Sequence, residues 1–117
     1  MKREIGDYIQ DIIDAMDKTM EFIGNLSYDE FIKDDKTIFA VTRALEVIGE
    51  AVKNVPEEVR GKYPQVPWKD MAGMRDKLIH EYHGVRLDIV WETVKEELPP
   101  LKPVFEKILA EIDGEKE

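Results

Sequence analysis

The segment GMRDKLIHEYHG, from Gly73 to Gly84, gathers side chains that can move protons and bind phosphate. It holds an arginine, an aspartate, two histidines and a tyrosine. Asp76 and His80 are four residues apart, so they lie on one face of a helix. A carboxylate in that position holds an imidazole in one tautomer and favours its protonated form. The pair can therefore act as an acid–base group with its orienting partner.

Arg75 and His80 do not share a helix face. They differ by about 140° around a regular helix, whereas Arg75 and Tyr82 lie about 20° apart. If two copies of the helix face each other across a two-fold axis, arginines and histidines of both chains can line one cleft. The spacing therefore favours a composite site in a homodimer. Small residues on the preceding apolar helix permit close approach of a second copy: Ala40, Ala44 and Gly49.

Structural and metal-binding roles compete with this interpretation. Asp76 and His80 can form an ordinary surface ion pair, with Arg75 covering apolar surface. His80 and His83 lack the H-E-x-x-H spacing of zinc proteases, and no third ligand is evident nearby. A di-iron site needs Glu-x-x-His, but Lys77 stands three residues before His80. We therefore expect no metal site and no cofactor.

The distribution of charge favours a local phosphate site. The net charge of the chain is −9, which opposes non-specific binding to nucleic acid or to an anionic membrane. The window from Arg60 to Arg86 nevertheless holds six basic residues against three acidic ones, so it carries +3 and the rest −12. Lys69, Lys77 and Arg86 are the candidate contacts to RNA phosphates. Alternatively, these cations pair with acidic neighbours.

Length and composition indicate one domain, residues 1–117. The chain has 117 residues and no cysteine, which excludes disulfides and thiol chemistry. Its start lacks the features of a signal peptide, and no apolar run reaches the roughly 20 residues that span a bilayer. We expect a cytoplasmic protein with no membrane partner.

Apolar residues recur at helical spacing without period-two alternation, so the predicted class is all-α. A first helix covers residues 5–23 and ends at Gly24 and Asn25. Ser27 and Glu30 form a capping box that opens a second helix. We expect this helix to continue through Val52, with a bend at residues 34–35 and neighbours on two sides.

Three further helices complete an antiparallel bundle of about five. A short one over residues 56–63 begins at Pro56, and the chemical motif lies on the carboxyl half of a helix over 67–82. The last apolar pattern, over 87–112, continues through three prolines, so it is kinked or restarts; we favour a restart at Pro99. Large aromatic residues are expected to pack between helices: Tyr63, Trp68 and Trp91.

Several segments resemble a known family. MRDKLIHEY matches the Arg-polar-x3-His-x-Tyr motif of HEPN-domain proteins. AVTRALEVIGEAVKNVP, YPQVPWKDMAGMRDKLIHEYHGV and IVWETVKEELPPLKPVFEKIL resemble, in this order, segments of the HepT-like toxin branch. The resemblance covers nearly the whole chain, with no departure at the motif positions.

The resemblance implies a helical dimer whose motif helices face one another. The resemblance also implies that the chain is the metal-independent RNase toxin of a type VII-like toxin–antitoxin system. Its antitoxin would be a minimal nucleotidyltransferase. By this resemblance Arg75 and His80 are catalytic, Asp76 fills the polar position, and Tyr82 receives AMP from the antitoxin. RNA would be the substrate, and no DNA partner is expected.

Two other classes of function stay open. The chain can be a non-catalytic nucleotide-binding or adaptor subunit of a nucleotidyltransferase complex, or a purely structural helical dimer. RNA cleavage in EDTA separates the enzyme from the adaptor. A structural dimer predicts that substitution of Arg75 or His80 changes no binding activity.

Overall fold

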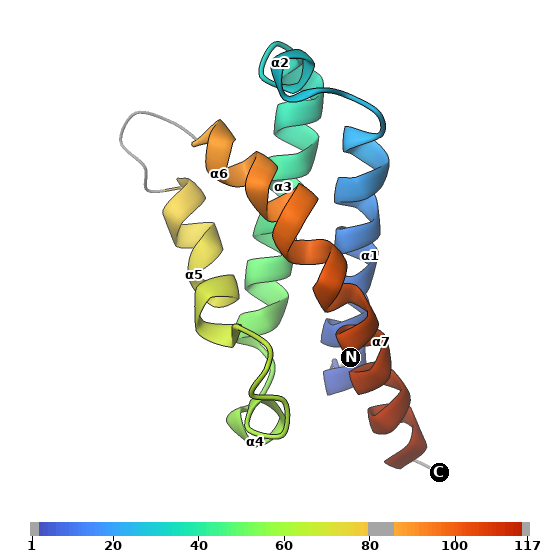
Figure 1. Ribbon diagram of the computed structural model, residues 1–117. Helices are drawn as coiled ribbons and strands as arrows, with labels where there is room; N and C mark the ends of the chain where they lie inside the picture. The colour runs from blue at the N-terminus through green and yellow to red at the C-terminus, as the bar shows by residue number, and fades with distance from the viewer. Residues whose placement is uncertain (1–2, 80–85, 116–117) are drawn as a thin grey trace.

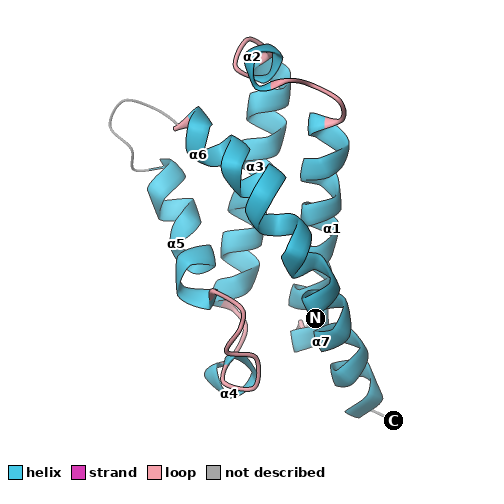
Figure 2. Cartoon of the chain, viewed as in Figure 1, coloured by secondary structure: helices cyan, strands magenta, loops and turns pink. Residues whose placement is uncertain are grey.

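The computed structural model describes residues 3–79 and 86–115, apart from the side chains of Arg75, residues 77–79 and Glu115. The described residues are helical and contain no strand, so the predicted all-α class is confirmed (Figure 1, Figure 2). The elements are α1 (Ile5–Ile23), α2 (Tyr28–Phe31), α3 (Asp35–Lys53), α4 (Glu57–Arg60), α5 (Trp68–Ile79), α6 (Leu87–Glu92), the π-helical segment η1 (Thr93–Glu97) and α7 (Leu98–Glu115). The long helices alternate in direction along the chain (Figure 1).

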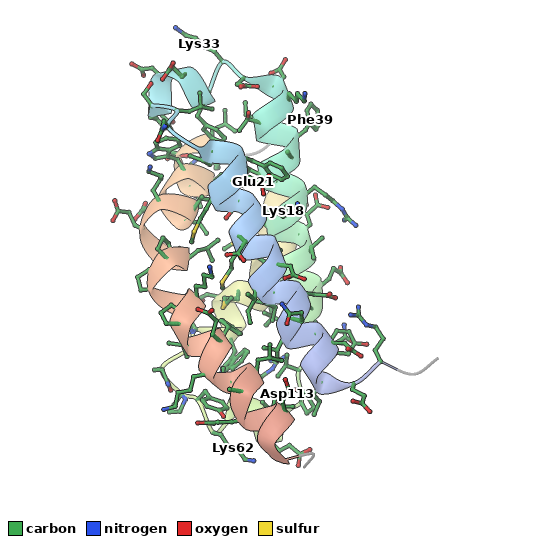
Figure 3. The ribbon with its side chains drawn as sticks, turned by 90° about the vertical axis from the view of Figure 1, so that its right-hand side faces the viewer. Lys18, Glu21, Lys33, Phe39, Lys62 and Asp113 are labelled. Carbon is green, nitrogen blue, oxygen red and sulfur yellow. The ribbon has the colours of Figure 1, made fainter. Side chains whose placement is uncertain are left out.

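Helix α1 has the bounds that its apolar stripe predicts. It ends where Gly24 takes a positive φ of 52° and donates its N–H to the Met20 carbonyl at 2.9 Å. A side chain is strained in that conformation, so the glycine sets the end of the helix. Lys18 and Glu21 lie on the outer face, 3.9 Å apart (Figure 3), and the buried residues lie on the opposite stripe.

The expected second helix is two helices, so the predicted bend at residues 34–35 is wrong. The Ser27–Glu30 capping box is confirmed: the Glu30 N–H donates to Ser27 Oγ at 3.2 Å, and the Ser27 N–H donates to Glu30 Oε1 at 2.9 Å. Helix α2 then ends after one turn. Asp34 leaves the helical region and accepts the Thr37 N–H at 3.0 Å, which starts α3. An aspartate that caps the next helix competes with continuation of the previous one.

Helix α3 lies between α1 and α5, as its wide apolar surface predicts. Ala44, Gly49 and Ala51 are buried within the chain. Most of the small residues that we expected to receive a second copy therefore serve packing inside the bundle, and Ala40 stays half-buried. Small side chains let neighbouring helices approach closely and pack tightly.

The restart expected at Pro99 is wrong, because α6, η1 and α7 form one continuous helical path. The Leu98 N–H donates to the Thr93 carbonyl, five residues back, which makes η1 a wide turn. A proline lacks an N–H and its ring displaces the carbonyl four residues earlier. For Pro99 and Pro100 those carbonyls belong to residues 95 and 96, inside η1. The wide turn therefore accommodates both prolines without a break.

One core cluster joins the helices, and the predicted aromatic packing is confirmed. The Trp68 ring meets Phe105 edge-on at 5.5 Å and donates Nε1–H to the Tyr63 carbonyl at 3.0 Å. The Trp91 ring lies 5.4 Å from that of Phe31. Fully buried large side chains include Phe31, Ile9, Ile12, Met16, Leu45, Ile48, Leu98, Phe105 and Ile108. In the described ranges no helix is both long and apolar enough to cross a membrane.

Helix α4 is shorter than predicted, and Pro56 precedes it as the N-cap instead of lying in its first turn. Arg60, at its end, donates Nε–H to the Val55 carbonyl at 2.9 Å and Nη2–H to the Val52 carbonyl at 2.7 Å. Terminal helix carbonyls have no partner within their own helix. Arg60 therefore caps the end of α3, and this part of the basic window serves the fold.

Candidate active site

Helix α5 carries the chemical motif and is anchored at its amino end. Trp68 and Met71 are buried, and Met74 is half-buried, which confirms the first part of the predicted core face. The positions of Arg75 and Asp76 follow in the second half of the helix. The core therefore fixes the start of α5, and the helix carries the motif away from that anchor.

Several predicted site residues lie outside the described residues. These are His80 and Tyr82, together with His83 of the rejected metal site. Lys77 has a helical backbone in α5 but no described side chain, and the same holds for Arg75. The structure therefore places the backbone of Arg75, and it tests neither the Asp76–His80 contact nor the proposed cleft.

Asp76 has a partner that the sequence did not reveal. Its Oδ1 lies 3.5 Å from Nζ of Lys53, in the last turn of α3, and the two side chains are 53% and 40% exposed. An exposed pair of this kind contributes about 0–1 kcal/mol. The pair mainly changes the local charge: the positive charge of Lys53 partly offsets the negative charge of Asp76, the carboxylate that is predicted to orient His80. The sequence around Asp76 does not predict this partner, because only the packing of α3 against α5 brings Lys53 close to Asp76.

Arg86 is engaged by a neighbouring carboxylate. Its Nε–H and Nη2–H donate to Asp88 Oδ1 and Oδ2 at 3.1 and 2.8 Å. These hydrogen bonds from the guanidinium hold the pKa of Asp88 below its ordinary value. Both side chains are more than half exposed. Arg86 can reach a phosphate only by sharing or exchanging this partner.

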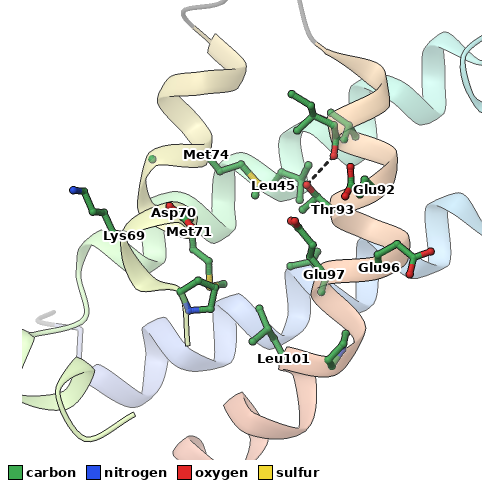
Figure 4. Close-up of a pocket in the computed structure, with 16 residues that line it drawn as sticks. Leu45, Lys69, Asp70, Met71, Met74, Glu92, Thr93, Glu96, Glu97 and Leu101 are labelled. Carbon is green, nitrogen blue, oxygen red and sulfur yellow. Dashed lines mark hydrogen bonds between the residues drawn. The ribbon is translucent and has the colours of Figure 1, made fainter. Parts of the chain in front are cut away.

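Lys69 borders a groove of about 770 Å³ between α5 and the continuous path of α6, η1 and α7 (Figure 4). Apolar residues from α3, α5 and α7 line it, among them Leu45, Met71 and Leu101. The other charged lining residues are acidic: Asp70, Glu92, Glu96 and Glu97. Lys69 therefore stands in surroundings that oppose an RNA phosphate.

Metal-binding side chains do not gather in the described part of the chain: no three His, Cys, Asp or Glu residues are placed to hold an ion there. The chemistry that this region offers is that of charged groups at the surface of a packed helix. Lys53 lies in the last turn of α3, and the Arg75 position lies in the second half of α5, adjacent in sequence to the Asp76 carboxylate that Lys53 approaches. Cationic residues from two helices favour the binding of an anion.

The whole motif falls inside a known family. Residues 12–108 match the model of the family described as Ribonuclease HepT-like. This range includes the described α5 and also residues 80–85, so the match covers all the predicted site residues.

Individual relatives agree over nearly the full length. A Methanocaldococcus jannaschii protein named as a candidate RNase is 51% identical over 116 residues, which are 99% of this chain and 96% of that protein. The "Probable ribonuclease HepT" of Thermococcus cleftensis is 50% identical over 108 residues, 92% of this chain and 98% of its own. A candidate RNase of Caldanaerobacter subterraneus is 47% identical over 102 residues, 87% and 91% of the two chains.

No solved structure matches the chain. The family assignment therefore rests on the sequence matches, and the helical architecture agrees with the one expected from the motif. The chain belongs to the HepT-like ribonuclease family.

Proposed function

We propose that this protein is the RNase toxin of a toxin–antitoxin pair and cleaves RNA without a divalent metal. The observation that carries the proposal is the HepT-like family match over residues 12–108, which encloses the Arg75–His80 motif on and after α5. Names of the relatives as ribonucleases support the substrate class.

The reaction needs a base, an acid and a cation. A base removes the proton from the ribose 2′-OH, and the resulting oxygen attacks the adjacent phosphorus. The bond from phosphorus to the 5′ oxygen then breaks, and an acid protonates that leaving oxygen. His80 supplies proton transfer, and Arg75 stabilises the extra negative charge on the five-coordinate phosphorus. The products are a 2′,3′-cyclic phosphate and a 5′-OH.

A homodimer completes this site in our proposal. Arg75 and His80 point about 140° apart on one regular helix, so one copy does not easily direct both at the same phosphate. Helix α5 packs mainly on α3, and its contact with α7 is at the Trp68 end, away from the second half that carries the motif. A second copy can therefore bring its own motif helix opposite the first.

Other cations then hold the RNA with unequal strength. Lys53 and Lys77 belong to the α3–α5 pair, whereas Arg86 shares its charge with Asp88 and Lys69 has only acidic charged neighbours around its groove. We expect Lys77→Ala to weaken RNA binding more than Lys69→Ala. Competition binding with an RNA oligonucleotide at two salt concentrations measures both effects.

Tyr82 is the control point in the proposed pair. Its phenolic oxygen would attack the α-phosphorus of ATP, with pyrophosphate leaving, and the partner nucleotidyltransferase would catalyse the transfer. The added AMP brings bulk and negative charge to a site that holds an RNA phosphate, so it blocks the substrate. Tyr82→Phe should keep RNase activity and lose this control. A mass-spectrometric adduct on another residue would contradict the assignment.

Substitution of the two motif residues tests the proposed enzyme. Arg75→Ala and His80→Ala should each lower the cleavage rate by about 100-fold or more, because each removes a group that acts in the transition state. Circular dichroism should show unchanged helicity. If His80→Ala cleaves RNA at a near-normal rate, the motif is structural; if the wild-type protein binds RNA without cleaving it, the adaptor function is favoured.

A further inference from the structure

The bundle has one open side. Helix α1 packs on α3 and α7, and α3 packs on α5, whereas α5 and α7 approach each other at the Trp68–Phe105 ring contact and have few other close contacts in the described residues. The groove of about 770 Å³ occupies this side. One wall is formed by residues 67–74, at the start of α5. The opposite wall is formed by residues 89–101, from α6 through η1 to the first turn of α7. At 1.5 Å per residue these walls are about 10 and 18 Å long, enough for two to three helical turns.

The groove has an apolar interior. Leu45, Met71, Met74 and Leu101 come from three helices and line it together (Figure 4). Methionine side chains are flexible and polarizable, so they adapt to different apolar partners. An apolar groove between two helices can receive the apolar face of a third helix.

Most of the charged side chains that line the groove are acidic. Asp70 lies on the α5 wall, and Glu92, Glu96 and Glu97 lie on the opposite wall; among the described lining residues the only cation is Lys69. Figure 4 shows Glu97 reaching from η1 toward the groove. No hydrogen bond or ion pair of these four carboxylates is formed with any other described side chain. The groove therefore offers unpaired negative charge beside apolar surface.

An apolar groove with acidic walls favours one kind of binding partner over others. The phosphates of RNA would meet four carboxylates and one lysine, so RNA is repelled here. A second copy seated by two-fold symmetry would bring the same acidic walls together, which costs free energy. A basic amphipathic helix satisfies both features, because its apolar face fills the groove and its lysines or arginines meet the carboxylates.

We infer that the groove is a docking site for a basic amphipathic helix of a partner protein. The inference goes beyond RNA cleavage and does not depend on it. Helix α5 forms one wall and also carries the Arg75 position. A docked partner would therefore contact the helix that bears the motif.

A synthetic probe tests the docking site directly. The probe is the fluorescein-labelled peptide LKKLLKLLKKLLKL, and its binding to the full chain is followed by fluorescence anisotropy at low salt. The variant Asp70→Asn/Glu92→Gln/Glu97→Gln should weaken binding by about tenfold or more, since complementary charges across an interface contribute to affinity and specificity. A peptide with glutamate in place of every lysine should not bind.

Two further variants separate docking from general attraction. The matched control Glu57→Gln/Glu58→Gln/Glu106→Gln removes the same charge from exposed positions outside the groove and should change affinity by less than about twofold. Gly73→Lys places a cation on the groove wall, where an added Cβ meets no atom within 4 Å, so the fold is retained. It should weaken binding as the triple variant does.

Three results would overturn the inference. Equal loss of affinity in the control triple would show that the peptide responds only to net charge. A fall in the affinity of a labelled RNA oligonucleotide for the groove triple variant, but not for the control triple variant, would assign the groove to RNA. A change in the monomer–dimer equilibrium on Gly73→Lys, measured by sedimentation, would assign it to a second copy. RNase activity enters none of these measurements, so the proposed enzyme can fail independently.

Discussion

At the scale of single residues, Asp76 connects the motif helix to its neighbour. Lys53 Nζ lies 3.5 Å from its carboxylate, and the predicted partner on the other side is His80. A carboxylate that is shared between a lysine and a histidine stabilises the imidazolium less than one that serves the histidine alone. Lys53 is therefore expected to tune the acid–base group from a different helix.

Removal of Lys53 tests this role. Lys53→Met should raise the pKa of His80, because the Asp76 carboxylate then acts on the imidazolium without a competing cation. An NMR titration of the histidine ring protons in a His83→Gln background measures the shift. Lys107→Met is the matched control, since Lys107 pairs with Glu111 at 4.0 Å on α7. An unchanged His80 pKa in Lys53→Met would show that Asp76 is not its partner.

The left-handed end of α1 gives a second test at the residue scale. Gly24→Ala should lower the free energy of unfolding by about 1 kcal/mol or more, because its φ of 52° is strained for a side chain. Gly114→Ala lies in α7, where an added Cβ meets no atom, and should instead stabilise the protein by about 0.5–1 kcal/mol. Urea unfolding followed by circular dichroism compares them. Equal effects of the two changes would contradict the assigned helix end.

At the scale of elements, the helix caps make stability depend on pH. Backbone N–H groups of Thr37 and Ser27 hold the pKa of Asp34 and of Glu30 below their ordinary values. A folded-state pKa below the unfolded one gives stabilisation that is complete above the unfolded value of about 3.9 for aspartate or 4.3 for glutamate. It is lost as the pH falls through the folded-state value.

Replacement of the α3 cap isolates this effect. Asp34→Asn keeps an oxygen that accepts the Thr37 N–H but removes the titration. The Tm of the wild type should therefore fall faster than that of the variant as the pH is lowered below about 4. Thermal melts at steps of half a pH unit measure both. Parallel curves would show that Asp34 does not stabilise α3 through its charge.

Local sequence signals predict the elements where one residue decides the outcome. Gly24 ends α1, and Ser27 with Glu30 starts α2, as their side chains and backbone preferences require. The break at Asp34 was not predicted, because the apolar pattern continues on both sides of it. The helix through Pro99 was not predicted either, since the wide turn of η1 depends on packing along the whole path.

At the scale of the whole molecule, the sequence predicts the motif and its helix but not the surroundings of the site. Asp76, Lys69 and Arg86 are visible as candidates, and the family match encloses them all. The Lys53–Asp76 pair, the cap formed by Arg60 and the acidic groove all depend on contacts between helices. Such contacts join residues far apart in the chain, so no local spacing reveals them.

The proposed shared cleft is also a property of the whole assembly. Mixed dimers of Arg75→Ala and His80→Ala chains should regain RNA cleavage, because the shared cleft then holds one intact combination of an arginine and a histidine from different chains. Activity after unfolding and refolding the two inactive proteins together measures the effect. Each variant refolded alone is the control. Proven exchange of subunits without activity would contradict a site that acts across the dimer.

The most direct test of the account is RNA cleavage in EDTA with identification of the ends produced. Purified wild-type protein is incubated with a 5′-labelled RNA oligonucleotide and with the same oligonucleotide carrying a 2′-deoxyribose at the cut position. We predict cleavage in EDTA, a 2′,3′-cyclic phosphate and a 5′-OH, and no cleavage at the deoxyribose, because the 2′ oxygen is the nucleophile. Activity that requires magnesium, or cleavage at the deoxyribose, would contradict the proposed mechanism.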